Sequence, residues 1–407
     1  MFGKIQLVRI LTFVFVIGKQ LLKLLFLALL RPQNAEALSF HFAELYSILL
    51  DFAEHSVSNP GFDLPTALGK GAANNVNRLL AKLYGGIYAC LSYGGSSGAI
   101  LTLLTAVLPK LHPDRELILF DEMCHQSTIG GLIFGRWKAV SIPRNVAKAH
   151  GTTKPITLAD IKALVEKYGA KNLAAIFLVI PSYDGFRQKS EETSIYAYAK
   201  ANGITLVIDA AWGSTAFRDN DGGEGQLASQ CDVLITSPHK RGLCPSSLGC
   251  IITKREDIAR IWDGALDLGF RSSSISFVET MVAEHRITQV LQGKWDIHFE
   301  RAELAASTLR QRMSEVHPDV YVVEPDHVGA DSSDPAHILV STSNLANVDA
   351  RLWAKHLSEH FAIDVEKATS TTLLLLCASP AHYAVINQTI EALRASLHMT
   401  INQVKGD

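Results

Sequence analysis

Short apolar runs alternate with amphipathic stretches along most of the chain beyond about residue 60. The apolar runs have the length of strands and end at polar or glycine-containing turns, whereas the stretches between them have helical spacing. Strands separated by helices predict a mostly parallel sheet that is covered by helices on both faces. The predicted helices cover residues 72–84, 100–108, 158–168 and 194–202, and the predicted strands cover residues 86–93, 116–120, 173–180, 204–208 and 233–235.

The pattern changes after residue 280 and predicts a second, smaller α+β domain. It begins with one long, charged helix over residues 284–313, followed by strands at 320–323, 336–343 and 373–377 and helices at 349–360 and 384–397. We therefore expect an apolar N-terminal helical segment at residues 1–35, a large domain at 36–310 and a small C-terminal domain at 311–407.

The N-terminal segment is strongly apolar over residues 5–30, but Lys19, Gln20 and Lys23 interrupt it. A membrane-spanning helix needs about 20 mostly apolar residues, so this segment is a poor one. It is compatible with a helix that packs on the protein or a partner subunit, and with an amphipathic helix that makes peripheral membrane contact. A signal peptide with a cleavage site near residues 35–37 is a third interpretation.

Composition narrows the class of protein. Of 407 residues, 48% are hydrophobic and 19% are charged, and the net charge is −2, which excludes intrinsic disorder and non-specific binding of nucleic acid. None of the six cysteines forms a Cys-x-x-Cys pair, so neither a zinc ribbon nor a thioredoxin motif is expected, and we expect no metal site. Unpaired cysteines fit a reducing compartment, and we expect a cytoplasmic protein.

Four polar segments each follow a predicted strand, where the functional residues of open α/β sheets collect. The glycine- and serine-rich residues 94–98 precede a helix and could bind a phosphate, and His125 could stack on an aromatic ring. Asp209 could pair with a protonated ring nitrogen, and a desolvated Lys240 could form a Schiff base. Each segment alone is also typical of an ordinary turn or helix cap. Together, in this order, they have the layout of a fold-type I pyridoxal phosphate enzyme.

These segments resemble the Orn/Lys/Arg decarboxylase family, the prokaryotic basic amino acid decarboxylases of fold type I. The resemblance extends over about residues 60–400 and rests on six ordered motifs. The motifs are Gly-Ser-Ser-Gly at 95–98, Cys-His-Gln-Ser at 124–127, Pro-Ser-Tyr-Asp-Gly at 181–185, Asp-Ala-Ala-Trp at 209–212, Ser-Pro-His-Lys at 237–240, and Val-Glu-Lys at 365–367 with the leucines 373–376.

The resemblance implies a pyridoxal 5'-phosphate cofactor and a role for each matching residue. Lys240 would form the aldimine, and Asp209 would keep the pyridine nitrogen protonated. His125 and Ala211 would contact the two faces of the ring, and Trp212 would lie near the cofactor and the substrate. Four side chains would bind the phosphate: Ser96, Ser97, Ser237 and His239. A serine of residues 272–274 would reach the phosphate of the neighbouring subunit in a homodimer.

The implied reaction is decarboxylation of ornithine, lysine, arginine or a related amino acid, which releases carbon dioxide and an amine and belongs to amino acid metabolism, as in polyamine biosynthesis. Asp184 and Glu366 could bind a basic substrate side chain. An aminotransferase, lyase or oxidase of amino acids in a specialised pathway would use the same cofactor. A non-enzymatic subunit with this fold is disfavoured because His125, Asp209 and Lys240 are all present.

Three residues depart from the family pattern and leave the substrate and reaction type open. Arg241 follows the lysine where the family usually has a small or apolar residue, Gln126 replaces a lysine, and Ile100 stands where the family often has a polar residue. The chain also lacks room for the additional terminal domains of the large inducible enzymes, which carry higher assembly, so we expect a dimer.

Overall fold

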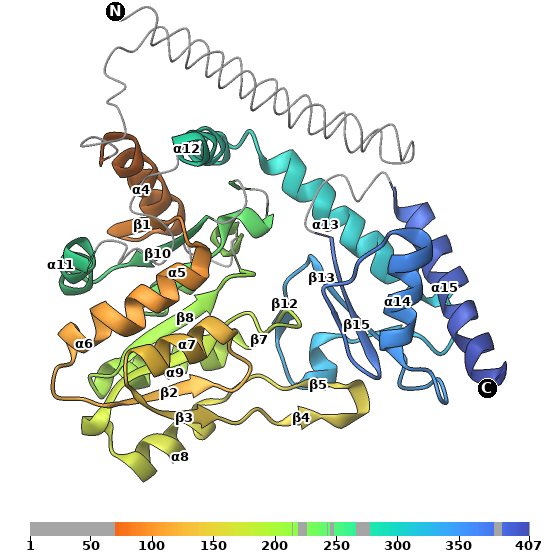
Figure 1. Ribbon diagram of the computed structural model, residues 1–407, viewed down its shortest axis with the longest axis horizontal. Helices are drawn as coiled ribbons and strands as arrows, with labels where there is room; N and C mark the ends of the chain where they lie inside the picture. Colours follow the sequence, from red (N-terminus) through yellow and green to blue (C-terminus); the bar gives the residue numbers. More distant parts are fainter. Residues whose placement is uncertain are drawn as a thin grey trace, which may run out of the picture.

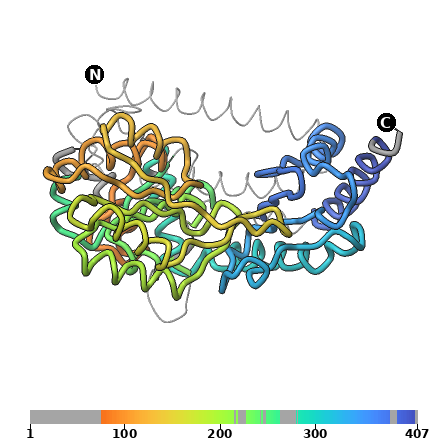
Figure 2. Tube along the Cα trace, turned by 90° about the horizontal axis from the view of Figure 1, so that it is seen from below, coloured from red at the N-terminus to blue at the C-terminus, as the bar shows by residue number. Residues whose placement is uncertain are grey.

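The computed structural model describes residues 70–213, 215–218, 226–241, 243–244, 248–265, 277–377 and 385–406. These residues form a larger and a smaller body, each built around its own sheet, and Figures 1 and 2 show the two lying side by side. The N-terminal segment 1–35 and the serines 272–274 lie outside the described residues. The proposed domain boundaries therefore stay a prediction.

The larger body contains a seven-stranded sheet that is mostly parallel, as predicted. Five neighbouring strands run parallel, and the next strand runs antiparallel to both of its neighbours. The strands, in spatial order, are β1 (Tyr88–Ser92), β10 (Gly249–Thr253), β9 (Val233–Thr236), β8 (Thr205–Ala210), β6 (Leu173–Val179), β2 (Leu117–Asp121) and β3 (Lys138–Ile142).

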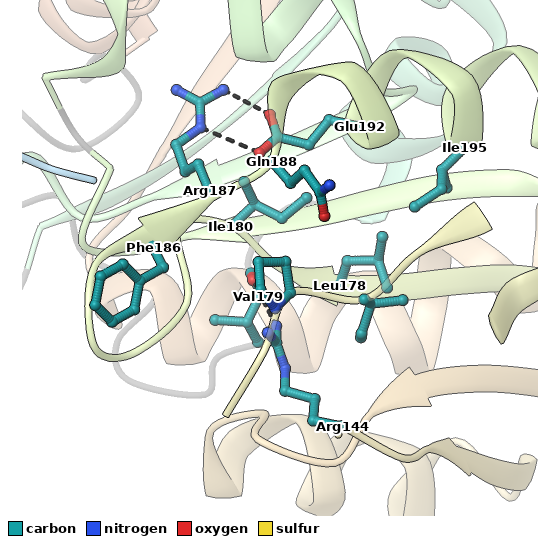
Figure 3. A pocket seen from close by; sticks show the side chains of 11 residues that line it. Arg144, Leu178, Val179, Ile180, Phe186, Arg187, Gln188, Glu192 and Ile195 are labelled. Carbon is teal, nitrogen blue, oxygen red and sulfur yellow. Dashed lines mark hydrogen bonds and ion pairs between the residues drawn. The ribbon is translucent and has the colours of Figure 1, made fainter. Parts of the chain in front are cut away.

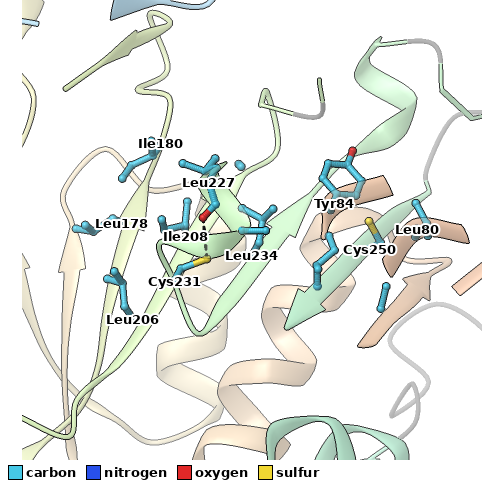
Figure 4. Packing of buried hydrophobic residues seen from close by; sticks show 14 of the residues in the cluster. Leu80, Tyr84, Leu178, Ile180, Leu206, Ile208, Leu227, Cys231, Leu234 and Cys250 are labelled. Atoms are coloured by element: carbon cyan, nitrogen blue, oxygen red, sulfur yellow. Dashed lines mark hydrogen bonds between the residues drawn. The ribbon is translucent and has the colours of Figure 1, made fainter. Parts of the chain in front are cut away.

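The two faces of this sheet are covered by separate hydrophobic clusters because side chains alternate along each strand. On β8, Ile208 packs into the cluster that Figure 4 shows, whereas its neighbour Val207 packs into the cluster on the other face. On β6, Leu178 and Phe177 divide in the same way. Burial on both faces explains why these strands read as continuous apolar runs in the sequence.

Helices surround the larger sheet. They are α4 (Lys70–Tyr84), α5 (Gly95–Thr102), α6 (Leu108–Leu111), α7 (Gln126–Phe134), α8 (Leu158–Tyr168), α9 (Lys189–Ala201), α10 (Gln226–Ser229), α11 (Glu256–Ala265) and α12 (Phe277–Leu291). Helices α7 and α11 and strands β3 and β10 were not predicted from the sequence. Residues 94–98 were expected to precede a helix, but helix α5 already begins at Gly95, so the serines of that segment lie in the first helical turn.

The smaller body has an antiparallel sheet in the order β11 (Tyr321–Val322), β13 (His337–Ser341), β15 (Thr372–Leu376) and β14 (Lys367–Ala368). Helices α13 (Asp296–Gln311), α14 (Ala350–Phe361) and α15 (Ile386–Gly406) pack around a core centred on the fully buried Trp353. The prediction of one helix over residues 284–313 was wrong. Gly293 has φ +71°, a conformation that glycine tolerates best, and it separates α12 from α13.

The two bodies meet where β7 (Phe186–Arg187) pairs with β12 (Ser332–Ser333), which Figure 1 shows between the two sheets. A short hairpin, β4 (Val146–Ala147) with β5 (Thr152–Thr153), extends from the larger body on the same side. The turn that follows β6 is thereby held against the smaller body. Across the described part of the chain, no helix has both the length and the apolarity needed to cross a bilayer.

Candidate active site

Lys240 lies directly beyond the carboxyl end of β9. After Thr236 the chain forms the 3₁₀ turn Pro238–Arg241, in which the amide of Lys240 donates to the carbonyl of Ser237 at 2.9 Å. The turn is closed by a second hydrogen bond, from the amide of Leu243 to the carbonyl of Pro238 at 3.0 Å. This turn holds the lysine at the edge of the sheet where the parallel strands end.

Asp209 lies on the neighbouring strand, as the penultimate residue of β8 and opposite Ile235 of β9. Its side chain is only 3% exposed, and one carboxylate oxygen accepts the amide of Ala211 at 3.0 Å. Burial raises the pKa of Asp209 to about 6, against the opposing effects of that hydrogen bond and of the Lys240 charge. Asp209 is thus a buried carboxylate within electrostatic range of Lys240.

The ammonium group of Lys240 lies over an aromatic ring. Its Nζ is 3.8 Å from the centroid of the Trp212 ring, a cation–π contact. Burial lowers the pKa of Lys240, while the negative charges of Asp209 and Glu366 act in the opposite direction. A lowered pKa favours the neutral amine, which is the nucleophilic form of lysine.

His125 and Ala211 are the two residues expected at the faces of the cofactor ring. His125 is the N-cap residue of α7, and its Nδ1 accepts the amide of Ser127 at 3.2 Å, which fixes the ring at the helix start. The pKa of His125 is lowered by burial and by the charge of Lys240. The half-buried Ala211 is next to both Asp209 and Trp212 in the chain.

The start of α5 forms a cradle of the kind that binds phosphate. Its first amides have no partner within the helix, and Ser96 and Ser97 lie there half-buried. Gly249 of β10 packs so closely on this turn that an added Cβ would lie 2.2 Å from the amide nitrogen of Ser96. Ser237 Oγ is buried and has no hydrogen-bond partner among the described residues, whereas His239 Nδ1 donates to the carbonyl of Leu248 at 2.6 Å.

These observations fit a phosphorylated aromatic cofactor such as pyridoxal phosphate. The open helix start and the unpartnered Ser237 hydroxyl could bind its phosphate. Asp209 could pair with its ring nitrogen, and Lys240 could bind it covalently. Trp212 Nε1 is also buried without a partner in the described chain, so a second donor is available for a ligand.

A buried ion pair next to Asp209 was not predicted from the sequence. Asp121, the last residue of β2, accepts Arg144 Nε at 2.8 Å, and both side chains are almost fully buried. The pair also binds the backbone of Val179, whose amide donates to Asp121 and whose carbonyl accepts Arg144, each at 3.1 Å. Val179 lies opposite Asp209 in the sheet, and the charge of Asp121 contributes to the raised pKa of Asp209. The position of Asp121 at the end of a predicted strand was the sequence signal that could have identified it.

The two acidic residues expected to bind a basic side chain differ in their surroundings. Asp184 is 5% exposed and already bonded, to Lys367 Nζ at 2.7 Å and to Thr152 Oγ1 at 2.5 Å. Glu366 is half-buried, accepts the hydroxyl of Tyr183 at 2.5 Å and acts electrostatically on Lys240. Glu366 is therefore the acidic group that could face a substrate.

A small cavity between β6 and α9 is separate from this group. Its volume is about 20 Å³, enough for a single water molecule and far too small for an amino acid. Figure 3 shows Arg144 on one side of it and the Arg187–Glu192 ion pair on another. Neither Lys240 nor Asp209 lines it.

No protein-family model matches the sequence. The chain is similar to proteins named arginine decarboxylase from Bacillus anthracis (23% identity), Bacillus cereus (23%) and Bacillus subtilis (24%), and each similarity covers 80% of this chain. The chain spans 64%, 69% and 64% of their respective lengths.

Among solved structures, the fold is similar to serine palmitoyltransferase of Sphingomonas wittichii (16% identity, TM-score 0.60, 81% of this chain and 77% of that one). It is also similar to the constitutive lysine decarboxylase of E. coli (19% identity, TM-score 0.60, 80% and 50%). The fold is therefore that of the fold-type I pyridoxal phosphate-dependent enzymes, as the sequence predicted.

Proposed function

We propose that this chain is a pyridoxal phosphate-dependent decarboxylase of a basic amino acid such as arginine, lysine or ornithine. The observation that carries the proposal is the arrangement of Lys240 and Asp209 on adjacent strand ends, one with a lowered and one with a raised pKa. Titratable groups whose pKa values are shifted by burial and by each other are typical of active sites. Relatives named arginine decarboxylase support the reaction class.

Pyridoxal phosphate, when bound, supplies an electron sink for the electron pair left when a bond to the substrate α-carbon breaks. In decarboxylation this is the bond to the carboxylate carbon: carbon dioxide leaves, and the α-carbon takes up a proton to give the amine. Asp209 would hold a proton on the pyridine nitrogen, which makes the ring a better electron acceptor. Lys240 Nζ, as a neutral amine, would bind the cofactor. Once the substrate amine has taken its place, the same nitrogen could accept a proton and then donate it to the α-carbon.

The other residues would orient the reactants. The start of α5 with Ser96 and Ser97, together with Ser237 and His239, would bind the phosphate. His125 and Ala211 would contact the two ring faces.

The surroundings of Glu366 support a basic substrate. Its carboxylate is half-buried, is oriented by the hydroxyl of Tyr183 and is close enough to act on the charge of Lys240. A partly desolvated carboxylate near the reacting amine would attract a substrate with a cationic side chain and disfavour an acidic one.

Cellular location and oligomeric state are also part of the proposed function. Unpaired cysteines in the described chain fit a reducing cytoplasm. We propose a homodimer whose substrate is a free basic amino acid, and peripheral membrane contact through residues 5–30 stays a hypothesis. Fractionation of the chain with and without residues 1–35 tests that contact, and equal pelleting of both forms would contradict it.

The experiment is a spectral titration of the purified apoprotein with pyridoxal phosphate, followed by a carbon dioxide assay with arginine, lysine and ornithine. We expect a visible absorbance band from the lysine-bound cofactor and release of carbon dioxide with one of the three. Lys240→Ala should abolish the band. Lys254→Ala, which removes an exposed lysine, is the matched control and should leave it unchanged.

The outcomes separate the alternatives. A band without carbon dioxide, accompanied by a keto acid, would favour an aminotransferase over a decarboxylase. A band that persists in Lys240→Ala would refute the role of Lys240. The absence of a band in the unmodified chain would refute the enzyme proposal and leave the fold alone.

A further inference from the structure

Arg241 follows Lys240 directly, and its side chain points away from solvent into an ion pair. It is 8% exposed and is paired with Asp334, which belongs to the segment between β12 and β13 of the smaller body. Asp334 is equally buried, with a side chain 8% exposed. Burial alone would raise the pKa of Asp334, but the charges of Arg241 and His337 hold it well below its usual range. The pair therefore exists as a charged pair inside the protein.

Asp334 is itself held rigidly by backbone contacts. Its carboxylate accepts the amide of Ala336 at 2.9 Å, and its own amide donates to the carbonyl of Gly185 at 2.8 Å. From α13, Arg310 donates to the carbonyls of Pro335 at 3.0 Å and Asp334 at 3.3 Å. These contacts fix the position of the Asp334 carboxylate, and the carboxylate in turn fixes the position of the Arg241 guanidinium.

His337, the first residue of β13, lies against Asp334 on one side and against Trp212 on the other. His337 Nδ1 is 3.3 Å from the carboxylate of Asp334, and the His337 ring is nearly fully buried. This ring meets the Trp212 ring edge-to-face, with centroids 5.6 Å apart and an interplanar angle of 88°. Trp212 in turn carries the Lys240 ammonium on its face at 3.8 Å. The contacts form a closed circuit from Lys240 through Arg241, Asp334, His337 and Trp212 back to Lys240.

We propose that Arg241, Asp334 and His337 are positioning residues for Lys240, through which the smaller body fixes the lysine above Trp212 for cofactor binding. The inference rests on the proposed function of Lys240 and extends it to three residues to which the sequence analysis gave no role. Removing one partner of a buried ion pair leaves an uncompensated charge, which forces local rearrangement. Here the rearrangement would occur one peptide bond from the lysine.

The test compares Arg241→Met with Arg187→Met in the full-length apoprotein. Arg187 forms a similarly buried pair with Glu192, with side chains 6% and 5% exposed, so the same substitution removes a comparable interaction elsewhere. Pyridoxal phosphate is titrated into each variant, and the dissociation constant and the pH midpoint of the visible band are measured. Urea unfolding of the apoproteins provides the structural baseline.

We expect Arg241→Met to raise the dissociation constant at least about tenfold, which corresponds to about 1.4 kcal/mol, and to shift the pH midpoint of the band. Arg187→Met should lose stability without either change. Arg241→Lys, which keeps the charge but not the planar fork, should recover part of the affinity. In the double variant with Asp334→Asn, the loss should be smaller than the sum of the single losses, because both residues act through one contact.

Two results would overturn the inference. The first is that Arg241→Met and Arg187→Met bind the cofactor with equal affinity and show equal pH midpoints. The second applies if Arg241→Met does not fold: it is that both Arg241→Lys and Asp334→Asn bind the cofactor with unchanged affinity. Failure of the unmodified chain to form the band would instead refute the proposed function, so the two failures are distinguishable.

Discussion

Asp209 gives a pH-dependent prediction because its burial is costly in the absence of a ligand. A carboxyl group whose pKa is about 6 in the folded chain, instead of the ordinary 3.8, destabilises the folded state once it is ionised. Its contribution to stability is fully present below about pH 4 and is lost as the pH rises through about 6. The complete loss corresponds to about 3 kcal/mol.

The perturbation is Asp209→Asn in the apoprotein. Asparagine keeps the oxygen that accepts the amide of Ala211 but carries no charge. By linkage, the ionisation penalty that the substitution removes is about 1.6 kcal/mol at pH 5 and about 3 kcal/mol at pH 8. The unfolding free energy of the variant, relative to the unmodified chain, should therefore rise by about 1.4 kcal/mol between these pH values.

The assay is urea denaturation of both apoproteins at pH 5, 6, 7 and 8. Asp349→Asn is the matched control, since Asp349 is a partly exposed N-cap residue whose pKa is lowered by its hydrogen bonds with Arg351. The Asp349 carboxyl is ionised in both the folded and the unfolded chain throughout this pH range. The difference in unfolding free energy between Asp349→Asn and the unmodified chain should therefore not change with pH. A flat or falling difference for Asp209→Asn would refute the reasoning.

Three further changes test other parts of the site. Gly249→Ala would put a Cβ against the amide of Ser96, so the dissociation constant for pyridoxal phosphate in a spectral titration should rise more than tenfold; unchanged binding would contradict the phosphate cradle. Glu366→Gln should raise KM for a basic amino acid at least about tenfold in the carbon dioxide assay, because a charge-assisted contact is lost. An unchanged KM would exclude Glu366 from substrate binding. Arg144→Met should lower the unfolding free energy in urea by about 3–5 kcal/mol, because Asp121 is left unpaired, and a loss under about 1 kcal/mol would be inconsistent with the buried pair.

The sequence was sufficient for most of the fold because local pattern determines it. The run that became β6 is apolar at every position, and β8 is apolar except at Thr205 and Asp209. The helix predicted over residues 284–313 failed for a local reason that the pattern overlooked. Amphipathic spacing continues across the break, but Gly293 adopts a positive φ there and the chain changes direction.

The relative positions of the site residues were also predictable, because the carboxyl ends of parallel strands meet at one edge. That rule alone brings Lys240 near Asp209 and His125. The pairing of charged side chains was not predictable. Nothing in the local sequence indicates that Lys367 neutralises Asp184, or that Arg241 finds its partner 93 residues away in Asp334. Such pairs are decided by the packing of the smaller body on the larger one.

Those pairs also identify what is unusual about Asp209. Three other buried aspartates around the site have a basic partner within the chain: Asp121 with Arg144, Asp184 with Lys367, and Asp334 with Arg241. In the described residues Asp209 forms no such ion pair, and burial raises its pKa. Because the other three carboxylates are paired within the chain, Asp209 is the one available to pair with a cation of a bound ligand. A protonated ring nitrogen is such a cation. Ligand binding should therefore stabilise the folded chain more above pH 6, where Asp209 is ionised, than below it.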